Sequence, residues 1–476
     1  MSLNHYLIFI ITLCILNVYG QFVPETRTGH SAVFSESEKK VYYIGGYNSN
    51  KSEPTEPNPI SDFFYLSIGN DDFFEFTDLT SQAKLPLTVF HVSELGGANQ
   101  DSIFILEGAH WNAEETNYVY RFDTKINQLS IPVVKGKAPS MRKGISSVSS
   151  EGKIYLFGGQ IGSGNDVTFF NNFDIFDTIN LNWQVGSLVN SPVGRSFYTA
   201  TLVNGVIYYI GGRTQVNVYS PLTEIYQYDI VANTWSLKKA TAVDADSMPG
   251  SRTAHSAVLI NGKIVIYGGF FSSADTPYNI PAKKTIAMLD VNTLVWSIPN
   301  FDIRKENLIP NLAFHTGTAM GTLMLIAFGN FTDIPNSIDQ TNKVIYSFLF
   351  GNPSQITSNV ISSFVKVNSS NNPKPQLPTS TSNKINPQQP SSLSKVVIVG
   401  VSIVSVSVAL AIFAAISVAY KRKKKNQVQS GDVLNNPNNE NNEKYHYEYQ
   451  QQYTSQFASQ QSQQHYTRDP PTIESP

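Results

Sequence analysis

Short apolar runs that end in a pair of glycines recur along the chain. Four complete runs occupy residues 41–46, 154–159, 207–212 and 264–269, and two degenerate copies occupy residues 103–108 and 325–330. The runs are rich in β-branched and aromatic residues, which favour buried β-strands. Glycine lets the backbone leave a strand in conformations that are closed to other residues. The pattern therefore predicts a β-structure with six repeats.

Two further motifs accompany each apolar run. An Arg-x-x-His-Ser motif or a variant of it precedes the run, and its copies begin at Arg27, Thr88, Arg142, Arg195, Arg252 and Leu312. An Asp follows the run, with a large apolar residue six positions later: Asp123 with Leu129, Asp177 with Trp183, Asp229 with Trp235, and Asp290 with Trp296. Ser67 and Phe73 take these places in the first copy, and the sixth copy has no clear equivalent. We expect the Asp to accept backbone amides in the turn that follows it, and the Trp to pack between neighbouring sheets.

The combined pattern resembles the kelch repeat and covers residues 27–355. The resemblance implies an all-β propeller in which each repeat forms one four-stranded blade. We expect six blades, and the weak ends of the array leave seven open. A strand from one terminus would close the ring. Residues 21–24 and residues 355–367 both remain candidates for that strand.

Both ends of the chain carry segments that predict membrane targeting. Residues 6–16 form an apolar run, and Val18 and Gly20 precede a suitable cleavage position, which predicts a signal peptide over residues 1–20. A buried first strand is the alternative. Residues 396–420 lack charge and are followed by five basic residues at 421–425. This pattern predicts a transmembrane helix with a cytoplasmic C-terminus, a single-pass type I topology; a buried core helix is the alternative.

The segments between these labels differ in composition. Residues 21–367 are the predicted propeller, and residues 368–395 are rich in Pro, Ser, Thr and Asn, which is typical of an extended stalk. Residues 421–476 begin with the basic stop-transfer cluster and continue as a Gln- and Asn-rich tail that we expect to be disordered. The tail tyrosines are candidates for phosphorylation or for docking a cytoplasmic partner: Tyr445, Tyr447, Tyr449, Tyr453 and Tyr466.

Charge and cysteine content exclude several classes of function. A net charge of −2 with 15% charged residues gives no overall basic surface for nucleic acid. Cys14 is the one cysteine of the chain, and it lies in the predicted signal peptide. Among kelch propellers, the galactose oxidase family uses copper with a tyrosine cross-linked to a cysteine. That cross-link cannot form here, so we expect no copper-radical oxidase chemistry and no cofactor.

No motif in the sequence has the spacing of a metal site. Four histidines share one repeat position and are assigned to the first strands of different blades: His30, His91, His255 and His315. Four arginines recur at the start of those strands: Arg27, Arg142, Arg195 and Arg252. An arginine there either pins a neighbouring loop through its donors or lines the axis and receives an acidic ligand.

The loops after the glycine pairs are the predicted binding surface, because they vary most and should gather on one face. The candidate residues are Tyr47, His110, Trp111, Arg213, Phe270 and Phe271. Exposed aromatics beside an arginine are typical of interface hot spots; the alternative is that several of them pack under their own loops. Asn50, Asn330 and Asn368 open glycosylation sequons.

Three functional hypotheses follow from this organisation. The first is a cell-surface binding, adhesion or receptor-like protein that recognises an extracellular protein or glycan, without enzymatic activity. The second is an enzyme whose acid, base or metal groups assemble from different blades at one end of the axial channel. The third is a structural, wall-associated membrane protein in which the propeller is a spacer.

Overall fold

The computed structural model divides the chain into two units, residues 1–367 and residues 368–476. It describes residues of the first unit, which are 22–48, 58–68, 74–85, 87–106, 108–110, 119–162, 166–272, 279–299, 310–332, 341–352 and 355–361. The predicted signal peptide, stalk, membrane segment and tail lie outside these residues. In the described part of the chain, no helix is long and apolar enough to cross a membrane.

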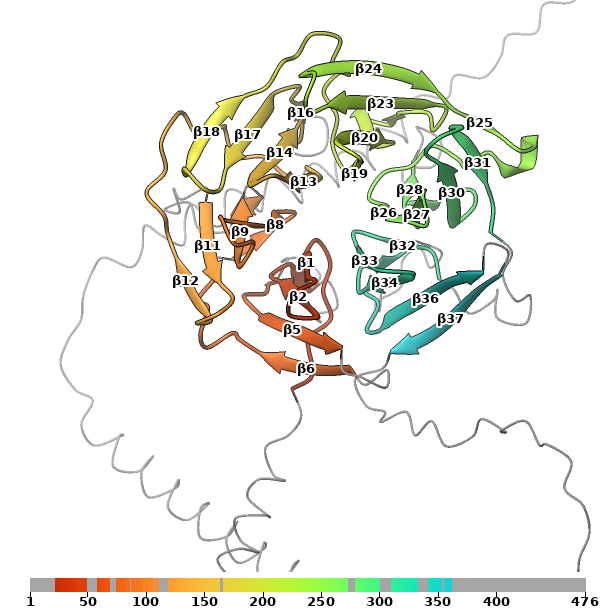
Figure 1. The fold of residues 1–476 in the computed structure, drawn as a ribbon. Helices are drawn as coiled ribbons and strands as arrows, with labels where there is room; N and C mark the ends of the chain where they lie inside the picture. The colour runs from red at the N-terminus through yellow and green to blue at the C-terminus, as the bar shows by residue number, and fades with distance from the viewer. Residues whose placement is uncertain are drawn as a thin grey trace, which may run out of the picture. The chain divides into compact units, whose positions relative to one another are not determined.

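The described residues form a ring of six sheets around a central axis (Figure 1), each with four antiparallel strands and one extended by a fifth strand, which confirms the predicted six-bladed β-propeller. Blade 1 contains β1 (Ser31–Ser35), β2 (Lys40–Ile44), β5 (Phe63–Ile68) and β6 (Phe74–Asp78). Blade 2 contains β8 (Val92–Gly96), β9 (Ser102–Leu106), β11 (Val119–Asp123) and β12 (Gln128–Ser130). Blade 3 contains β13 (Ser147–Ser150), β14 (Lys153–Phe157), β17 (Phe173–Asp177) and β18 (Asn182–Val185).

Blades 4 to 6 repeat the same strand order. Blade 4 contains β19 (Thr199–Val203), β20 (Val206–Ile210), β23 (Glu224–Asp229) and β24 (Thr234–Lys239). Blade 5 contains β26 (Ser256–Ile260), β27 (Lys263–Tyr267), β30 (Ile286–Asp290) and β31 (Val295–Ser297). Blade 6 contains β33 (Thr316–Met320), β34 (Leu323–Ala327), β36 (Ile345–Asn352) and β37 (Gln355–Ile361). A fifth strand, β25 (Thr241–Ala242), pairs in parallel with β31. The 3-10 turn η1 covers Ala245–Ser247.

Each blade is built from one repeat, so the ring closes by packing and not by strand exchange. Of the two candidate segments, residues 355–361 supply the outer strand of blade 6 as β37. Residues 22–24 form no strand. Across the closing junction, the Gly29 N–H donates to the carbonyl of Phe314 at 3.0 Å, and Phe328 of blade 6 packs edge-on to Tyr43 of blade 1.

Hydrophobic clusters fill all six junctions between neighbouring blades. The junction between blades 3 and 4 contains Phe157 and Phe173 from β14 and β17, and Trp235 from β24. Trp183 and Trp296 occupy the same repeat position in the clusters on either side. The indole therefore lies between sheets, as its spacing from the Asp predicts, and the blades depend on one another for their cores.

The two faces of the ring carry different connections. On one face the inner strands begin and the glycine pairs end the second strands; we call it the loop face. Short two-stranded ladders cover it: β3 (Tyr47–Asn48) with β4 (Asn58–Pro59), β7 (Thr88–Val89) with β10 (Ala109–His110), β15 (Gln160–Ile161) with β16 (Thr168–Phe169), β21 (Arg213–Gln215) with β22 (Val218–Tyr219), β28 (Phe270–Phe271) with β29 (Ile280–Pro281), and β32 (Leu312–Ala313) with β35 (Asn330–Phe331).

The opposite face, which we call the turn face, carries tight turns closed by aspartates. Asp177 Oδ1 accepts hydrogen bonds from the N–H groups of Ile179 and Asn180 at 3.0 and 2.8 Å. Asp123, Asp229 and Asp290 accept backbone amides in the same way. These bonds confirm the role that the sequence predicts for the repeated Asp, and they fix the turn between the two outer strands.

Candidate functional site

Six residues at one repeat position form a ring around the axis where the inner strands begin; we call it the axial ring. It consists of Gly29, Phe90, Gly144, Phe197, Ala254 and Phe314, all with φ between 51° and 72°. Five backbone hydrogen bonds join these residues from blade to blade, and in each the N–H of one residue donates to the carbonyl of the other. The pairs are Phe90 to Gly29 (2.7 Å), Phe197 to Gly144 (2.6 Å), Ala254 to Phe197 (2.9 Å), Phe314 to Ala254 (3.0 Å) and Gly29 to Phe314 (3.0 Å).

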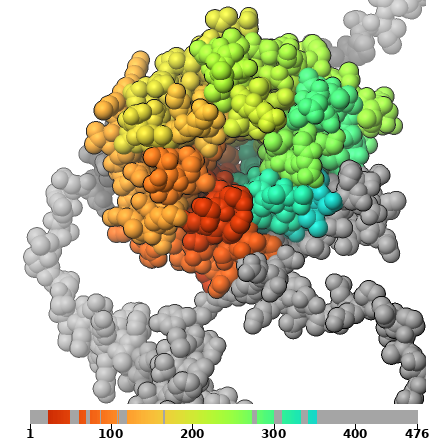
Figure 2. Space-filling model, viewed as in Figure 1, coloured from red at the N-terminus to blue at the C-terminus, as the bar shows by residue number. Residues whose placement is uncertain are grey.

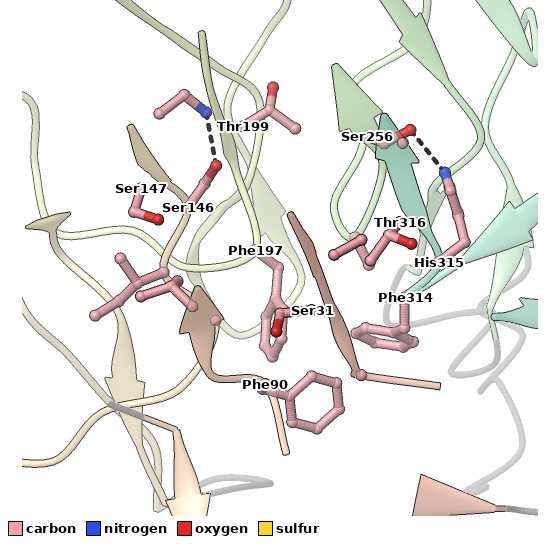
Figure 3. Close-up of a pocket in the computed structure, with 18 of the residues that line it drawn as sticks. Ser31, Phe90, Ser146, Ser147, Phe197, Thr199, Ser256, Phe314, His315 and Thr316 are labelled. Carbon is pink, nitrogen blue, oxygen red and sulfur yellow. Dashed lines mark hydrogen bonds between the residues drawn. The ribbon is translucent and has the colours of Figure 1, made fainter. Parts of the chain in front are cut away.

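Small residues and phenylalanines alternate around the axial ring, which leaves space for three rings to meet at the axis. The centroid of Phe90 lies 5.2 Å from that of Phe197 and 5.3 Å from that of Phe314, and Phe197 and Phe314 are also 5.3 Å apart (Figure 3). A Cβ at Gly29 would lie 2.7 Å from the ring of Phe90. The three phenylalanines therefore meet at the loop end of the axial channel.

Three of the sequence-predicted loop residues pack around these phenylalanines. Tyr47 contacts Phe90 with centroids 5.9 Å apart, and Phe270 contacts Phe314 at 5.6 Å. The guanidinium carbon of Arg213 lies 5.9 Å from the ring centroid of Phe197. Arg213 also donates to Gln160 Oε1 from Nη2 at 2.8 Å, which orients the guanidinium. All of these side chains are half-buried apart from Gln160, which is buried.

We call the five aromatic side chains the aromatic cluster: Tyr47, Phe90, Phe197, Phe270 and Phe314. The sequence-predicted Phe271 is half-buried in β28 and pairs with Ile280 of β29. His110 lies in β10, paired with Thr88. Trp111 lies outside the described residues. The loop face thus presents an aromatic centre with the Arg213 guanidinium against it.

A cavity of about 290 Å³ extends from the axial ring along the inner strands, and Figure 2 shows the hollow at the centre of the ring. Hydroxyl side chains supply most of its polar lining: Ser31, Ser93, Ser146, Ser147, Thr199, Ser256 and Thr316. Ala32, Ala200, Ala257 and Gly317 leave the space between them. We call this cavity the axial chamber.

The four repeated histidines line the axial chamber and join neighbouring blades. Each Nε2 lies within hydrogen-bond distance of a hydroxyl from the preceding blade of the ring. The pairs are His30 with Thr316 (3.0 Å), His91 with Ser31 (2.8 Å), His255 with Thr199 (3.2 Å) and His315 with Ser256 (2.9 Å). Blade 4 uses Tyr198, whose hydroxyl donates to the carbonyls of Ser146 and Phe157 in blade 3. Blade 3 has Ile145 at this position.

Burial makes these imidazoles hard to protonate. It lowers the pKa of His30 and of His255 well below the usual value, with a further contribution from the neighbouring arginine of the same blade in each case. It lowers the pKa of His315 to about 3. Since the charged form loses hydration in the ring, the three histidines are neutral at physiological pH. In the part of the chain that the structure describes, no three His, Cys, Asp or Glu residues gather as metal ligands.

The four repeated arginines are buried inside their own blades. Arg27 pairs with Asp62 at 2.7 Å and Arg142 with Asp174 at 2.6 Å. Three of the arginines donate from Nη1 to the carbonyl of the first glycine of their own pair: Arg27 to Gly45 (3.2 Å), Arg195 to Gly211 (3.4 Å) and Arg252 to Gly268 (2.8 Å). The guanidinium groups therefore hold the start of the first strand against the end of the second strand.

Asn330 is the one sequon residue within the described residues. It lies in β35, is half-buried, and its Oδ1 accepts from the Thr341 hydroxyl at 3.3 Å. Asn50 and Asn368 lie outside the described residues.

Sequence reasoning did not identify the three axial phenylalanines or the chamber. The signal was present in alternate copies of the first motif, which read Val-Phe-His, Ser-Phe-Tyr and Ala-Phe-His at Phe90, Phe197 and Phe314. The intervening copies have Gly or Ala at the same position.

Comparison with known families gives two overlapping matches, over residues 12–212 and 95–330, to the model described as the KLHDC2/KLHL20/DRC7 Kelch-repeats domain. Among curated proteins, the chain is 28% identical over 254 residues to Kelch domain-containing protein 3 of Bos taurus, covering 51% of this chain and 64% of that protein. It is 23% identical over 260 residues to Kelch domain-containing protein 10 of Rattus norvegicus, covering 53% of this chain and 61% of that protein.

The chain thus spans less than two thirds of the length of these relatives. Among solved structures, it is similar to the one titled "Structure of YjhT", with a TM-score of 0.54 and 15% identity over 71% of this chain and 98% of that chain. At this identity the likeness concerns the fold alone.

Proposed function

Since the chain belongs to the kelch-repeat domain family, we propose that its propeller is a binding module that holds a protein partner on the loop face. The observation that carries this proposal is the aromatic cluster with Arg213 beside it at the centre of that face. Half-buried aromatics and arginine are the residues that contribute most to protein interfaces.

The side chains of the aromatic cluster also contact one another, which favours binding because these contacts restrict their conformations. The backbone bonds of the axial ring fix its three phenylalanines, and Gln160 fixes Arg213. Side chains that are already ordered lose little conformational entropy when a partner packs on them. We therefore propose recognition and not catalysis as the role of this face.

The finer proposal is a cell-surface protein with an extracellular protein or glycan ligand and a cytoplasmic tail that contacts partners inside. Its support lies in the sequence: the apolar run at residues 6–16, the uncharged segment 396–420 and the basic cluster 421–425. A protein ligand is favoured over a glycan because aromatic side chains beside an arginine are typical of protein interfaces.

The loop-face proposal predicts the behaviour of two variants of the full-length chain. The double variant Arg213→Ala/Phe270→Ser should reduce the partner that co-purifies from native cells by about thirtyfold or more, because a single hot-spot residue contributes about 2 kcal/mol or more. Val231→Ser is the control, since Val231 is 92% exposed in a turn on the opposite face. Equal recovery of the partner with both variants, at equal melting temperature, would contradict the proposal.

The membrane proposal predicts the position of two epitope tags, one after Gln21 and one at the C-terminus. The first tag should stain on intact cells, and the second should stain after permeabilisation only. Glycosidase treatment should reduce the apparent mass if the sequons are used. An N-terminal tag that stays in the cytosol would show that the propeller faces the cytosol.

A further inference from the structure

One carboxyl group stands apart in the axial chamber. Glu94 of β8 belongs to its lining, and its Oε1 accepts a hydrogen bond from the Ser147 hydroxyl of the next blade at 2.7 Å. Among the residues that line the chamber there is no lysine or arginine, and Glu94 is the one acidic residue. The chamber therefore contains a carboxyl group without a basic partner in its lining.

The electrostatics of the chamber favour a cationic guest. Burial raises the pKa of Glu94 to about 7, although hydrogen bonds from Ser147 and Ser149 oppose this shift. Three of the four lining histidines supply no compensating charge, because burial holds the pKa values of His30, His255 and His315 below the usual range. A cation beside Glu94 would restore the interaction that the carboxylate loses on leaving water.

The strands around Glu94 contribute no competing charge. The sequences of β1, β8, β9 and β13 contain no titratable side chain other than Glu94 itself. The next strand outward, β14, carries Lys153 and Tyr155, and neither belongs to the chamber lining. Among these strands, the group that ionises near neutral pH is thus Glu94. His91, three residues before it, also lines the chamber, and its Nε2 lies 2.8 Å from the Ser31 hydroxyl.

The remaining lining selects the kind of cation. Phe90, Phe197 and Phe314 line the loop end of the chamber with aromatic rings, which accommodate the apolar part of an organic cation. The wall hydroxyls offer acceptors for N–H donors. A divalent metal ion requires several carboxylate or imidazole ligands gathered at one point, and the chamber histidines and Glu94 are not grouped in that way among the described residues. A volume of about 290 Å³ also has room for a molecule of several non-hydrogen atoms.

We propose that the axial chamber binds a small organic ammonium ion, with Glu94 as its counter-ion. The guest is either a free amine or the ammonium group of a lysine-like side chain that a partner inserts. The chamber and the aromatic cluster share Phe90, Phe197 and Phe314 (Figure 3). Glu94 belongs to the chamber alone, so a Glu94 variant tests the chamber without changing the aromatic cluster.

Isothermal titration of the full-length chain with butylammonium chloride tests the proposal, and 1-butanol serves as the neutral analogue of equal size. Butylammonium should bind at least about tenfold more tightly than 1-butanol, because a charge-assisted bond replaces a neutral one. Its affinity should rise about tenfold between pH 6 and pH 8, since Glu94 ionises over that range.

Glu94→Gln should remove the preference for butylammonium while keeping an acceptor for Ser147. Glu36→Gln is the matched control, because Glu36 is 73% exposed on a turn and far from the lining. Equal affinity for the amine and the alcohol, or unchanged amine binding in Glu94→Gln, would overturn the proposal. If Glu94→Gln does not fold, the butylammonium affinity of the wild type between pH 6 and pH 8 tests the proposal. An affinity that does not change with pH would overturn the proposal. Tighter binding of a lysine-bearing peptide than of butylammonium in the same titration would identify a partner side chain as the guest.

Discussion

Lowering the pH from 6 to 5 is expected to destabilise the propeller by about 2–3 kcal/mol, well before most carboxylates protonate. His30, His255 and His315 cause this loss, because each is buried and neutral in a bridge between blades. Their pKa values are lowered in the folded state. Below about pH 6.5 the unfolded chain therefore binds protons that the folded chain does not, and stability falls with pH.

Two contributions of opposite sign set the size of the effect. Each of the three histidines contributes a slope of up to about 1.4 kcal/mol per pH unit below pH 6.5. The pKa of Glu94 is raised to about 7, so its protonation stabilises the folded state by about 1 kcal/mol over the same interval. The histidine contribution dominates because there are three histidines. The unfolding free energy continues to fall until the pH reaches their folded-state pKa values.

Urea denaturation at pH 7, 6 and 5 measures this slope. His315→Gln is the variant to compare, because glutamine keeps a polar group near Ser256 and does not titrate. The slope of the unfolding free energy against pH should decrease by about 1.4 kcal/mol per unit in the variant. A slope equal to that of the wild type would show that protonation of His315 does not limit acid stability.

Trp235→Ala is expected to destabilise the propeller by about 3–5 kcal/mol. The indole is 3% exposed and lies between blades 3 and 4, with ring centroids 5.0 Å from Phe157 and 4.8 Å from Tyr209. Its Nε1 donates to the carbonyl of Ser187 at 2.7 Å. The substitution removes this bond and leaves a cavity that rigid strands on both sides cannot fill.

The midpoint of thermal or urea unfolding measures this loss. Trp235→Phe is the graded control, because it keeps most of the ring contacts and loses the hydrogen bond, so it should destabilise by less than Trp235→Ala. Leu237→Ala on the same strand is 42% exposed in the wild type and should have a small effect. A Trp235→Ala loss below about 1 kcal/mol would mean that the indole does not hold the two blades together.

Repetition explains why so much of the fold is predictable. The glycine pairs mark the end of each second strand, and the Asp with its distant Trp marks the outer turn and the junction between sheets. Because every blade has the same strand order and packs against its neighbours in the same way, a degenerate copy such as residues 103–108 is recognisable by comparison with the complete copies. The number of blades stayed open at the sequence level because residues 355–361 carry no repeat signature, although they form β37.

The axial features were not predictable in the same way, because they depend on one residue from each of six repeats. Nothing in the local sequence around Phe90 indicates that it meets Phe197 and Phe314 at distances of 5.2 and 5.3 Å. Glu94 likewise occurs once, in a strand whose counterparts carry uncharged residues at that position, such as Val33 and Val258. For the four repeated arginines, by contrast, the sequence shows their recurrence, but it does not show that their side chains are buried.

Site-specific photo-crosslinking tests most directly whether the loop face is the binding surface. A photo-reactive phenylalanine analogue is placed at position 271 on the loop face or at position 231 on the turn face of the full-length chain in its native cells. We predict a discrete crosslinked adduct with a partner protein from position 271 and none from position 231. An adduct of equal yield from position 231, or one from position 231 alone, would contradict the account.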